Sequence, residues 1–293
     1  MPGALGASIQ HVPQLERRAA APPPQRPPRF EEALAHRLFL ALSPSLRGGG
    51  RAAPAPPPFE NFRLPRAHGR GELEATWFPA VGEARGAVLL AHPWTRWGRA
   101  YFHRRGRLLA LRRAGYHAMT FDFGGLGSGG PVPEGFFDLD VEDAFRALAA
   151  RAPGLPLHVW GVSGGGYWAH PFLTRTDRCS GAFFEDVAIH LIEWSKRQAP
   201  AGMPFYLFFQ RVLRRAHRFL DLRSHAPHLR VRNVAYAAGG ADRGIPVRET
   251  AELASLAGGP CLIVPEADHL EALRRDAPGV IDLALATFRD AEG

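Results

Sequence analysis

The chain has 293 residues, of which 46% are hydrophobic and 22% charged, so it can bury a substantial core and has the composition of a globular protein. The formal net charge is +8, yet nearly all the positive charge is arginine, and no basic run alternates with aromatic residues. This pattern argues against nucleic-acid binding. No stretch approaches the ~18 consecutive apolar residues that a membrane-spanning helix requires.

The chain contains two cysteines, Cys179 and Cys261. Two thiols do not make a disulfide framework, and no cluster of cysteine and histidine has the spacing of a zinc site. The N-terminus carries no apolar segment after a basic start, so the sequence indicates no secretory signal. We therefore expect a cytoplasmic protein.

Residues 1–60 differ from the rest of the chain because two proline tracts, residues 21–28 and 53–58, should be extended. Between them, residues 30–42 have apolar side chains at helical spacing. They could form a docking helix for a membrane surface, or a short helix that packs on the domain or is only marginally stable; the second reading is favoured. We expect a largely disordered extension with one short helix, followed by one domain over residues 61–293.

From about residue 71, strand patterns alternate with helix patterns. Alternating or continuous apolar runs predict strands, and apolar residues at helical spacing predict the helices between them. The expected strands are residues 73–78, 87–91, 116–121, 157–162, 181–186, 234–238 and 261–264, and the expected helices are residues 101–113, 141–150, 247–256 and 277–288. This rhythm indicates an α/β fold with a mostly parallel, doubly wound sheet.

Residues 187–228 interrupt this rhythm and predict a small helical cap. The interruption lies between two strands that both end at the same edge of the sheet. It holds a run of five apolar residues from Phe205 to Phe209, too apolar for a free surface loop. We expect Phe205 and Phe208 to bind an apolar part of the substrate; the alternative is that this segment only packs on the body of the domain.

The sequence Gly161-Val162-Ser163-Gly164-Gly165 follows the strand at residues 157–162. Its G-x-S-x-G spacing is typical of a nucleophilic serine on a tight strand-to-helix turn, where neighbouring side chains would clash. The N–H of Gly164 then lies at a helix N-terminus, where it can donate to a developing oxyanion.

A serine hydroxyl needs a base and a group that orients the base. His269 follows the last strand and Asp242 follows the strand before it, so both lie at the sheet edge that carries Ser163. Asp186 ends an earlier strand and is the alternative acid. Asp268, next to His269, is expected to cap its own loop.

The order Ser163, Asp242, His269 resembles that of the α/β-hydrolase fold. The resemblance covers about residues 71–289 and includes two further segments. The segment His92-Pro93-Trp94 is similar to the oxyanion loop of that fold, with Pro93 in place of a glycine, and it implies the N–H of Trp94 as the second oxyanion donor. The turn at residues 122–127 is similar to a D-x-R-G-x-G-x-S segment, with Gly124 and Gly129 at the positions of its arginine and serine.

These residues predict a serine hydrolase that cleaves an ester of an apolar acyl group, with thioesters and amides as further possibilities. Its partner is a small molecule, and the chemistry requires no metal and no organic cofactor. Two alternatives stay open: an acyltransferase or aminopeptidase-like enzyme, and a hydrolase-like binding module without catalysis.

Overall fold

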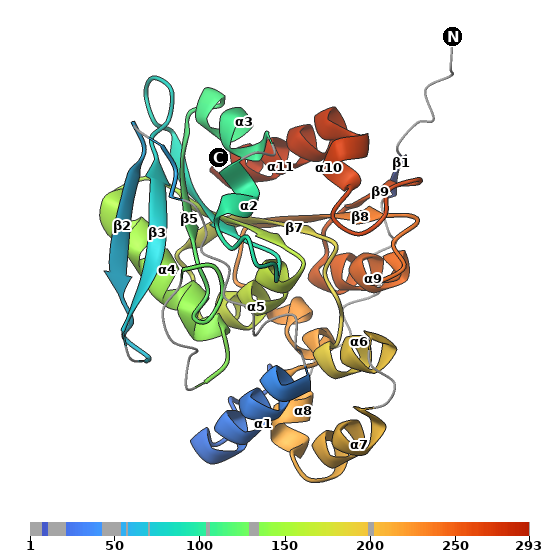
Figure 1. The fold of residues 1–293 in the computed structure, drawn as a ribbon. Coiled ribbons are helices and arrows are strands. Elements are labelled where there is room, and N and C mark those ends of the chain that lie inside the picture. Colours follow the sequence, from blue (N-terminus) through green and yellow to red (C-terminus); the bar gives the residue numbers. More distant parts are fainter. Residues whose placement is uncertain are drawn as a thin grey trace.

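The computed structural model describes residues 8–10, 22–42, 54–56, 58–69, 71–103, 106–128, 135–198 and 202–292 (Figure 1). Much of the extension predicted at residues 1–60, and Gly129 of the turn after residue 122, lie outside the described residues. The domain boundary at residue 61 therefore stays a prediction.

One nine-stranded sheet runs through the molecule in the order β1-β9-β8-β7-β6-β4-β5-β3-β2. The six strands from β9 to β5 are parallel, and β3, β2 and β1 pair antiparallel at the two sides. The predicted, mostly parallel α/β sheet is confirmed. The strands are β1 (Ser8–Gln10), β2 (Glu60–Pro65), β3 (Glu72–Phe78), β4 (Gly86–Ala91), β5 (Tyr116–Phe121), β6 (Leu157–Val162), β7 (Cys179–Glu185), β8 (Asn233–Gly239) and β9 (Cys261–Val264).

Helices cover both faces of the sheet (Figure 1). One face carries α2 (Ala100–His103), α3 (Arg107–Arg113), α10 (Ala272–Arg275) and α11 (Ala277–Glu292), and the other carries α4 (Asp138–Arg151), α5 (Gly164–Leu173) and α9 (Val247–Ala257). Each face has its own apolar core. Because β4 and β6 lie between the two cores, every residue of both strands is buried, which explains their near-continuous apolar sequences.

The single helix predicted at residues 101–113 is two helices, α2 and α3. Gly106 has φ 76°, a left-handed conformation that glycine tolerates and that ends a right-handed helix. The apolar spacing continues across this break, so periodicity alone did not reveal it.

The insertion between β7 and β8 forms a small helical layer at one end of the molecule (Figure 1). It consists of α6 (Leu191–Gln198), α7 (Met203–Arg211) and α8 (Arg214–Phe219), followed by two short 3-10 turns, η3 (Leu222–Ser224) and η4 (Ala226–His228). The buried residues of α7 and α8 recur every three or four positions: Tyr206, Phe209, Leu213, Ala216 and Phe219. One side of this layer therefore packs inward and the other faces solvent.

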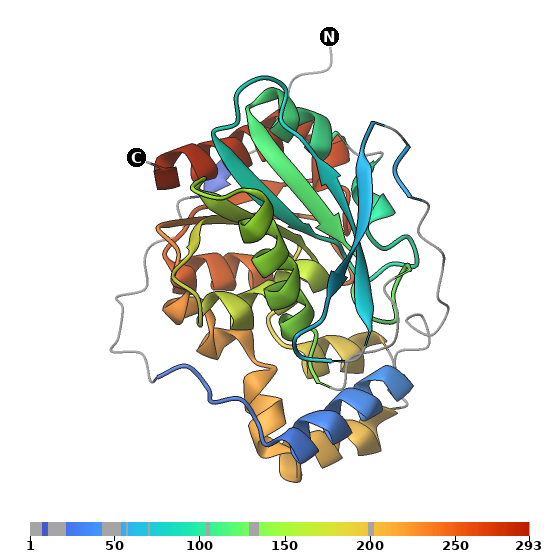
Figure 2. The same cartoon turned by 90° about the vertical axis from the view of Figure 1, so that its left-hand side faces the viewer.

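The helix expected at residues 30–42 is α1 (Arg29–Leu42), which lies against α8 (Figure 2). Its Glu32 carboxylate accepts a hydrogen bond from the N–H of Phe136 and pairs with Arg26, which also binds Asp138. The His36 ring packs edge-on against Phe137, 5.0 Å between centroids. This helix is thus attached to the body of the protein by both polar and apolar contacts.

Cys179 and Cys261 are both free thiols in the core, and burial raises the pKa of each. None of the helices within the described ranges has the length and apolar character that crossing a bilayer would require.

Candidate active site

Ser163 occupies the turn between β6 and α5, with a left-handed φ of 48°. The two glycines of the motif are required by close backbone contacts. A Cβ at Gly161 would lie 2.5 Å from the Cα of Gly166, and one at Gly165 would collide with the carbonyl oxygen of Ala91. The spacing in the sequence therefore reflects a tight turn that holds the serine in a strained conformation above the sheet edge.

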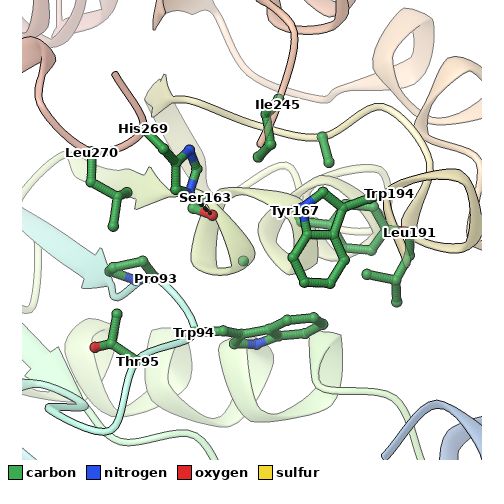
Figure 3. Close-up of a pocket in the computed structure, with 12 residues that line it drawn as sticks. Pro93, Trp94, Thr95, Ser163, Tyr167, Leu191, Trp194, Ile245, His269 and Leu270 are labelled. Atoms are coloured by element: carbon green, nitrogen blue, oxygen red, sulfur yellow. Dashed lines mark hydrogen bonds between the residues drawn. The ribbon is translucent and has the colours of Figure 1, made fainter. Parts of the chain in front are cut away.

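A chain of hydrogen bonds joins Ser163, His269 and Asp242. The Oγ of Ser163 lies 3.1 Å from Nε2 of His269, and Nδ1 of His269 lies 2.7 Å from Oδ2 of Asp242. Because a carboxylate accepts, Nδ1 carries the proton and Nε2 is left to accept from the serine hydroxyl. The other oxygen of Asp242, Oδ1, accepts from the backbone N–H groups of Gly244 and Ile245, both at 2.7 Å. Hydrogen bonds thus join three side chains that are far apart in sequence, and Figure 3 shows the one between Ser163 and His269.

The environment of His269 shifts the pKa of its imidazole ring. Burial lowers the pKa of the imidazole, but the hydrogen bond and the charge of Asp242 oppose this, and Asp186 adds to them, so the pKa lies above its ordinary value. The partly exposed ring is therefore a somewhat stronger base than a free imidazole.

Asp186, the alternative acid, makes different contacts. It follows β7 with φ 49° and is buried. Its Oδ1 accepts from the N–H of Gly239 at 2.8 Å, and its Oδ2 accepts from the N–H of Leu270 at 2.9 Å. Burial raises its pKa to about 6, although the charge of His269 and the bond from Gly239 act in the opposite direction. Asp186 therefore connects the loop of Asp242 to the loop of His269 through their backbones.

Asp268 lies on the surface and its Oδ1 accepts from its neighbour's N–H, that of His269, at 2.7 Å. This contact is the loop-capping arrangement expected for it. It also leaves the His269 ring to Asp242.

Asp186, Asp242 and His269 have potential metal-ligand atoms that all lie within 4.8 Å of one another. The carboxylate oxygens of this cluster already accept hydrogen bonds from backbone N–H groups or from His269. In this structure these oxygens therefore connect the loops and orient the His269 ring.

The loop after β4 brings Trp94 next to the serine. The buried His92 accepts from the N–H of Phe123 at Nε2, which leaves Nδ1 to donate to the carbonyl of Pro93 at 2.7 Å. Burial lowers the pKa of His92, so the ring stays neutral in this role. The Trp94 ring in turn covers Gly164, where a Cβ would lie 2.7 Å from its Cγ.

A cavity of about 190 Å³ opens beside Ser163 (Figure 3). Apart from Ser163 and His269, its walls are mostly apolar and aromatic, and the Trp94 and Trp194 rings lie 6.5 Å apart between centroids. The lining residues are Pro93, Trp94, Thr95, Ser163, Gly164, Tyr167, Ala188, Leu191, Trp194, Ile245, His269 and Leu270. Both residues expected to supply oxyanion donors, Gly164 and Trp94, thus border the same space as the serine.

Phe205 and Phe208 do not line this cavity, and their predicted role in substrate binding is corrected. Both belong to α7, whose Tyr206 and Phe209 face inward and are buried. Since neighbouring positions on a helix point about 100° apart, Phe205 and Phe208 face solvent. Because five consecutive residues are apolar, the sequence does not indicate which of them face inward.

The insertion contributes to the cavity through α6 instead, by Leu191 and Trp194. These two residues are three apart and follow β7 closely, a signal that the sequence does contain. Tyr167 lies one helical turn after Ser163 on α5, so it faces the same side of that helix as the serine. Ile245 and Leu270 follow Asp242 and His269 closely in the sequence. Nothing in these two aliphatic side chains distinguishes them in the sequence as cavity residues.

Comparison with known proteins gives likenesses in structure alone: no protein-family model and no curated protein sequence matches this chain. An esterase of Pyrococcus furiosus superposes with a TM-score of 0.67 at 16% identity, over 83% of this chain and 97% of the esterase. The esterase domain of a Rhodothermus marinus protein gives a TM-score of 0.60 at 19% identity, over 80% of this chain and 100% of that domain. An acylaminoacyl peptidase of Pyrococcus horikoshii gives 0.56 at 13% identity, over 78% of this chain and 40% of the peptidase.

At these identities the likeness establishes the fold. It extends over most of the chain, in keeping with the sheet order and the helical layers described above. The resemblance inferred from the sequence is confirmed at this level: the protein has the α/β-hydrolase fold.

Proposed function

We propose that this protein with the α/β-hydrolase fold is a serine hydrolase that cleaves esters of apolar acyl groups. The observation that carries the proposal is the hydrogen-bonded chain from Ser163 through His269 to Asp242. A binding module would have no need of a serine, a neutral base and a buried acid in this order.

In the proposed reaction His269 takes the proton of Ser163 while Oγ attacks the acyl carbonyl carbon. Asp242 stabilises the imidazolium that forms, and the imidazolium then gives its proton to the departing alcohol. The acyl group remains bonded to Oγ until a water, deprotonated by His269, attacks the acyl carbon. The bond from this carbon to Oγ then breaks, Oγ takes the proton back from His269, and the carboxylic acid leaves. The enzyme returns to its starting state with no change in oxidation.

The negative oxygen of the tetrahedral intermediate needs donors. We assign the backbone N–H groups of Gly164 and Trp94 to this role, because both residues border the cavity at Ser163 and Gly164 begins α5. One such donor contributes about 3 kcal/mol to stabilising the transition state. Pro93 has no N–H and contributes only to the shape of the loop.

The cavity supports an apolar substrate. Trp94, Tyr167, Leu191 and Trp194 all contribute to its wall. Its volume of about 190 Å³ is somewhat larger than the ~150 Å³ apolar cavity that accommodates benzene. It would hold an acyl chain of short to medium length or a single ring, whose burial stabilises binding by up to ~0.8 kcal/mol for each methylene.

The decisive experiment is covalent labelling with a fluorophosphonate. The protein should react, and Ser163→Ala or His269→Ala should abolish the reaction, while Ser180→Ala on β7 should leave it unchanged. Labelling that survives Ser163→Ala would refute the assignment of the nucleophile, and an unreactive wild type would favour a binding module.

Turnover by the unlabelled enzyme can then separate the reaction classes. Turnover of a nitrophenyl ester, of a matched acylamino anilide and of the ester with an added alcohol acceptor distinguishes an esterase from a peptidase and from an acyltransferase. An ester rate that exceeds the anilide rate, with free acid as the product, is the expected result.

A further inference from the structure

The outward side of α7 and α8 is unlike the rest of the surface. Tyr206 and Phe209 fix the orientation of α7, since both are buried and the Tyr206 hydroxyl donates to the carbonyl of Ser195 at 2.8 Å. The remaining side chains of α7 must therefore face solvent. We call this outward side, residues 203–218, the cap face.

The cap face gathers exposed apolar side chains. Of the nine large apolar side chains that are exposed in the described part of the chain, five lie within residues 203–212. They are between 37% and 60% exposed: Met203, Phe205, Leu207, Phe208 and Val212. Single exposed apolar residues need no explanation, but a contiguous group marks an interaction surface.

Arginines follow this apolar group directly. Arg211, Arg214, Arg215 and Arg218 are all exposed, and residues 203–220 contain no aspartate or glutamate. Within the described residues, the salt bridges of the protein involve other arginines. The cap face thus combines an apolar centre with four exposed arginines. Glu31 of α1 lies at its border, where its carboxylate accepts from the N–H of Ala216 at 2.8 Å.

The cap face lies at one end of the molecule. Figures 1 and 2 both show α7 and α8, with α1 beside them, at the end opposite α3 and α11. The helix before α7 in the chain, α6, supplies Leu191 and Trp194 to the cavity at Ser163. A partner bound at α7 would therefore contact the same insertion that borders the cavity.

We propose that the cap face docks on the surface of a lipid aggregate whose headgroups carry negative charge. Aromatic and aliphatic side chains beside arginines are the composition of segments that lie in a membrane interface, with the apolar side among the acyl chains and the cations among anionic headgroups. The proposal does not depend on Ser163 being catalytic.

Charge decides between this partner and a second copy of the chain. A two-fold dimer places the same patch of both copies in contact, so the four arginines of one cap face would oppose those of the other. An anionic surface neutralises them instead.

The test measures cosedimentation of the full chain with vesicles. One set of vesicles is phosphatidylcholine alone, and the other contains phosphatidylcholine with phosphatidylglycerol. We expect binding to the anionic vesicles at least ~10-fold tighter than to the neutral ones, and weakened by salt.

Two variants address the two parts of the cap face. The first, Phe205→Ser with Leu207→Ser and Phe208→Ser, removes apolar side chains that lie outside the cavity. The second changes Arg211, Arg214, Arg215 and Arg218 to glutamine. Each should lose at least ~10-fold in vesicle affinity while keeping its turnover of a soluble acetyl ester. If the first variant loses thermal stability, the second, which changes only exposed cations, decides.

Two controls carry changes of the same kind elsewhere. Leu109→Ser removes one exposed apolar residue of α3, and a set of four arginine-to-glutamine changes at exposed positions lowers the net charge by the same amount as the second variant. These positions are Arg113, Arg178, Arg248 and Arg289. Both controls should bind the anionic vesicles within ~2-fold of the wild type.

Three results would overturn the proposal. The wild type could fail to bind either kind of vesicle, or the two arginine sets could weaken binding equally, which would reflect net charge alone. Alternatively, sedimentation velocity could show a dimer that only the apolar variant abolishes, with vesicle binding unchanged, which would assign the cap face to a second copy.

Discussion

The sheet edge and the insertion at residues 187–228 contribute to one cavity in different ways. At the edge, the side chains of Ser163, Asp186, Asp242 and His269 each have hydrogen-bond partners within the protein. The insertion adds Leu191 and Trp194, which offer shape and apolar surface. In the proposed reaction the chemistry therefore depends on the ends of strands, whereas the choice of substrate depends on how short helices pack. Changes at the edge should therefore affect turnover, and changes in the insertion should affect selectivity.

The largest effect should separate the two acids at the edge. Asp242→Asn replaces the acceptor of the His269 Nδ1–H by a neutral group that favours the wrong tautomer, and we expect turnover to fall by about 10⁴-fold. Asp186→Asn keeps this bond and should cost roughly ten-fold, with a lower Tm, because an amide cannot accept from both Gly239 and Leu270. Steady-state kinetics and thermal unfolding of both variants at one pH provide the measurement. If Asp186→Asn is the more damaging to turnover, the acid role passes to Asp186.

The pH dependence of kcat/KM should reflect the protonation of His269 at the sheet edge. His269 acts as a base only when neutral, and its pKa is raised, so kcat/KM should fall on the acid side of a pKa above the ordinary 6.5, about ten-fold for each pH unit. In Asp242→Asn the group that raises this pKa is lost, and the residual activity should extend to lower pH. An unchanged acid limb in this variant would show that another group, such as Asp186 with its pKa near 6, controls it.

The insertion should show its effect in selectivity. We expect the wild type to prefer medium-chain acyl esters over acetyl esters by about ten-fold, since each buried methylene adds up to ~0.8 kcal/mol. Trp194→Ala removes part of the cavity wall and should flatten this preference while sparing acetyl turnover. Phe205→Ala is the control, because its side chain lies in the same insertion but outside the cavity. A loss of preference in the control alone would contradict the assignment of the wall.

The smallest expected effect concerns α1, which lies beside the insertion. Ala35 of this helix is fully buried, so Ala35→Asp places a charge in an apolar environment and should lower the Tm by about 5 °C or more. Phe30→Ser changes the same helix at a side chain that is 79% exposed and should alter the Tm by less than ~1 °C. Equal Tm values for the two variants would mean that α1 adds little to the stability of the protein.

The sheet edge was largely readable from the sequence. Glycines around Ser163, and acidic and histidine residues directly after apolar runs, mark the ends of parallel strands that must share one edge. The arrangement of the insertion could not be predicted in this way. Residues 205–209 are all apolar, and only tertiary packing decides that Tyr206 and Phe209 face inward. The attachment of α1 was also hidden, since it depends on Glu32 meeting the backbone of Phe136, a contact between residues 104 positions apart.

The short strand β1 has a consequence for how the chain reaches its folded state. Ser8–Gln10 pairs antiparallel with β9, the last strand of the parallel sheet, and so covers a backbone edge that would otherwise be open to strands of other molecules. The two partners lie far apart in the sequence. During synthesis β1 is made first and has no partner until β9 has been made, and any form lacking residues 8–10 leaves the edge of β9 uncovered. Self-association through β9 is therefore an aggregation hazard that we expect for forms of this protein without residues 8–10.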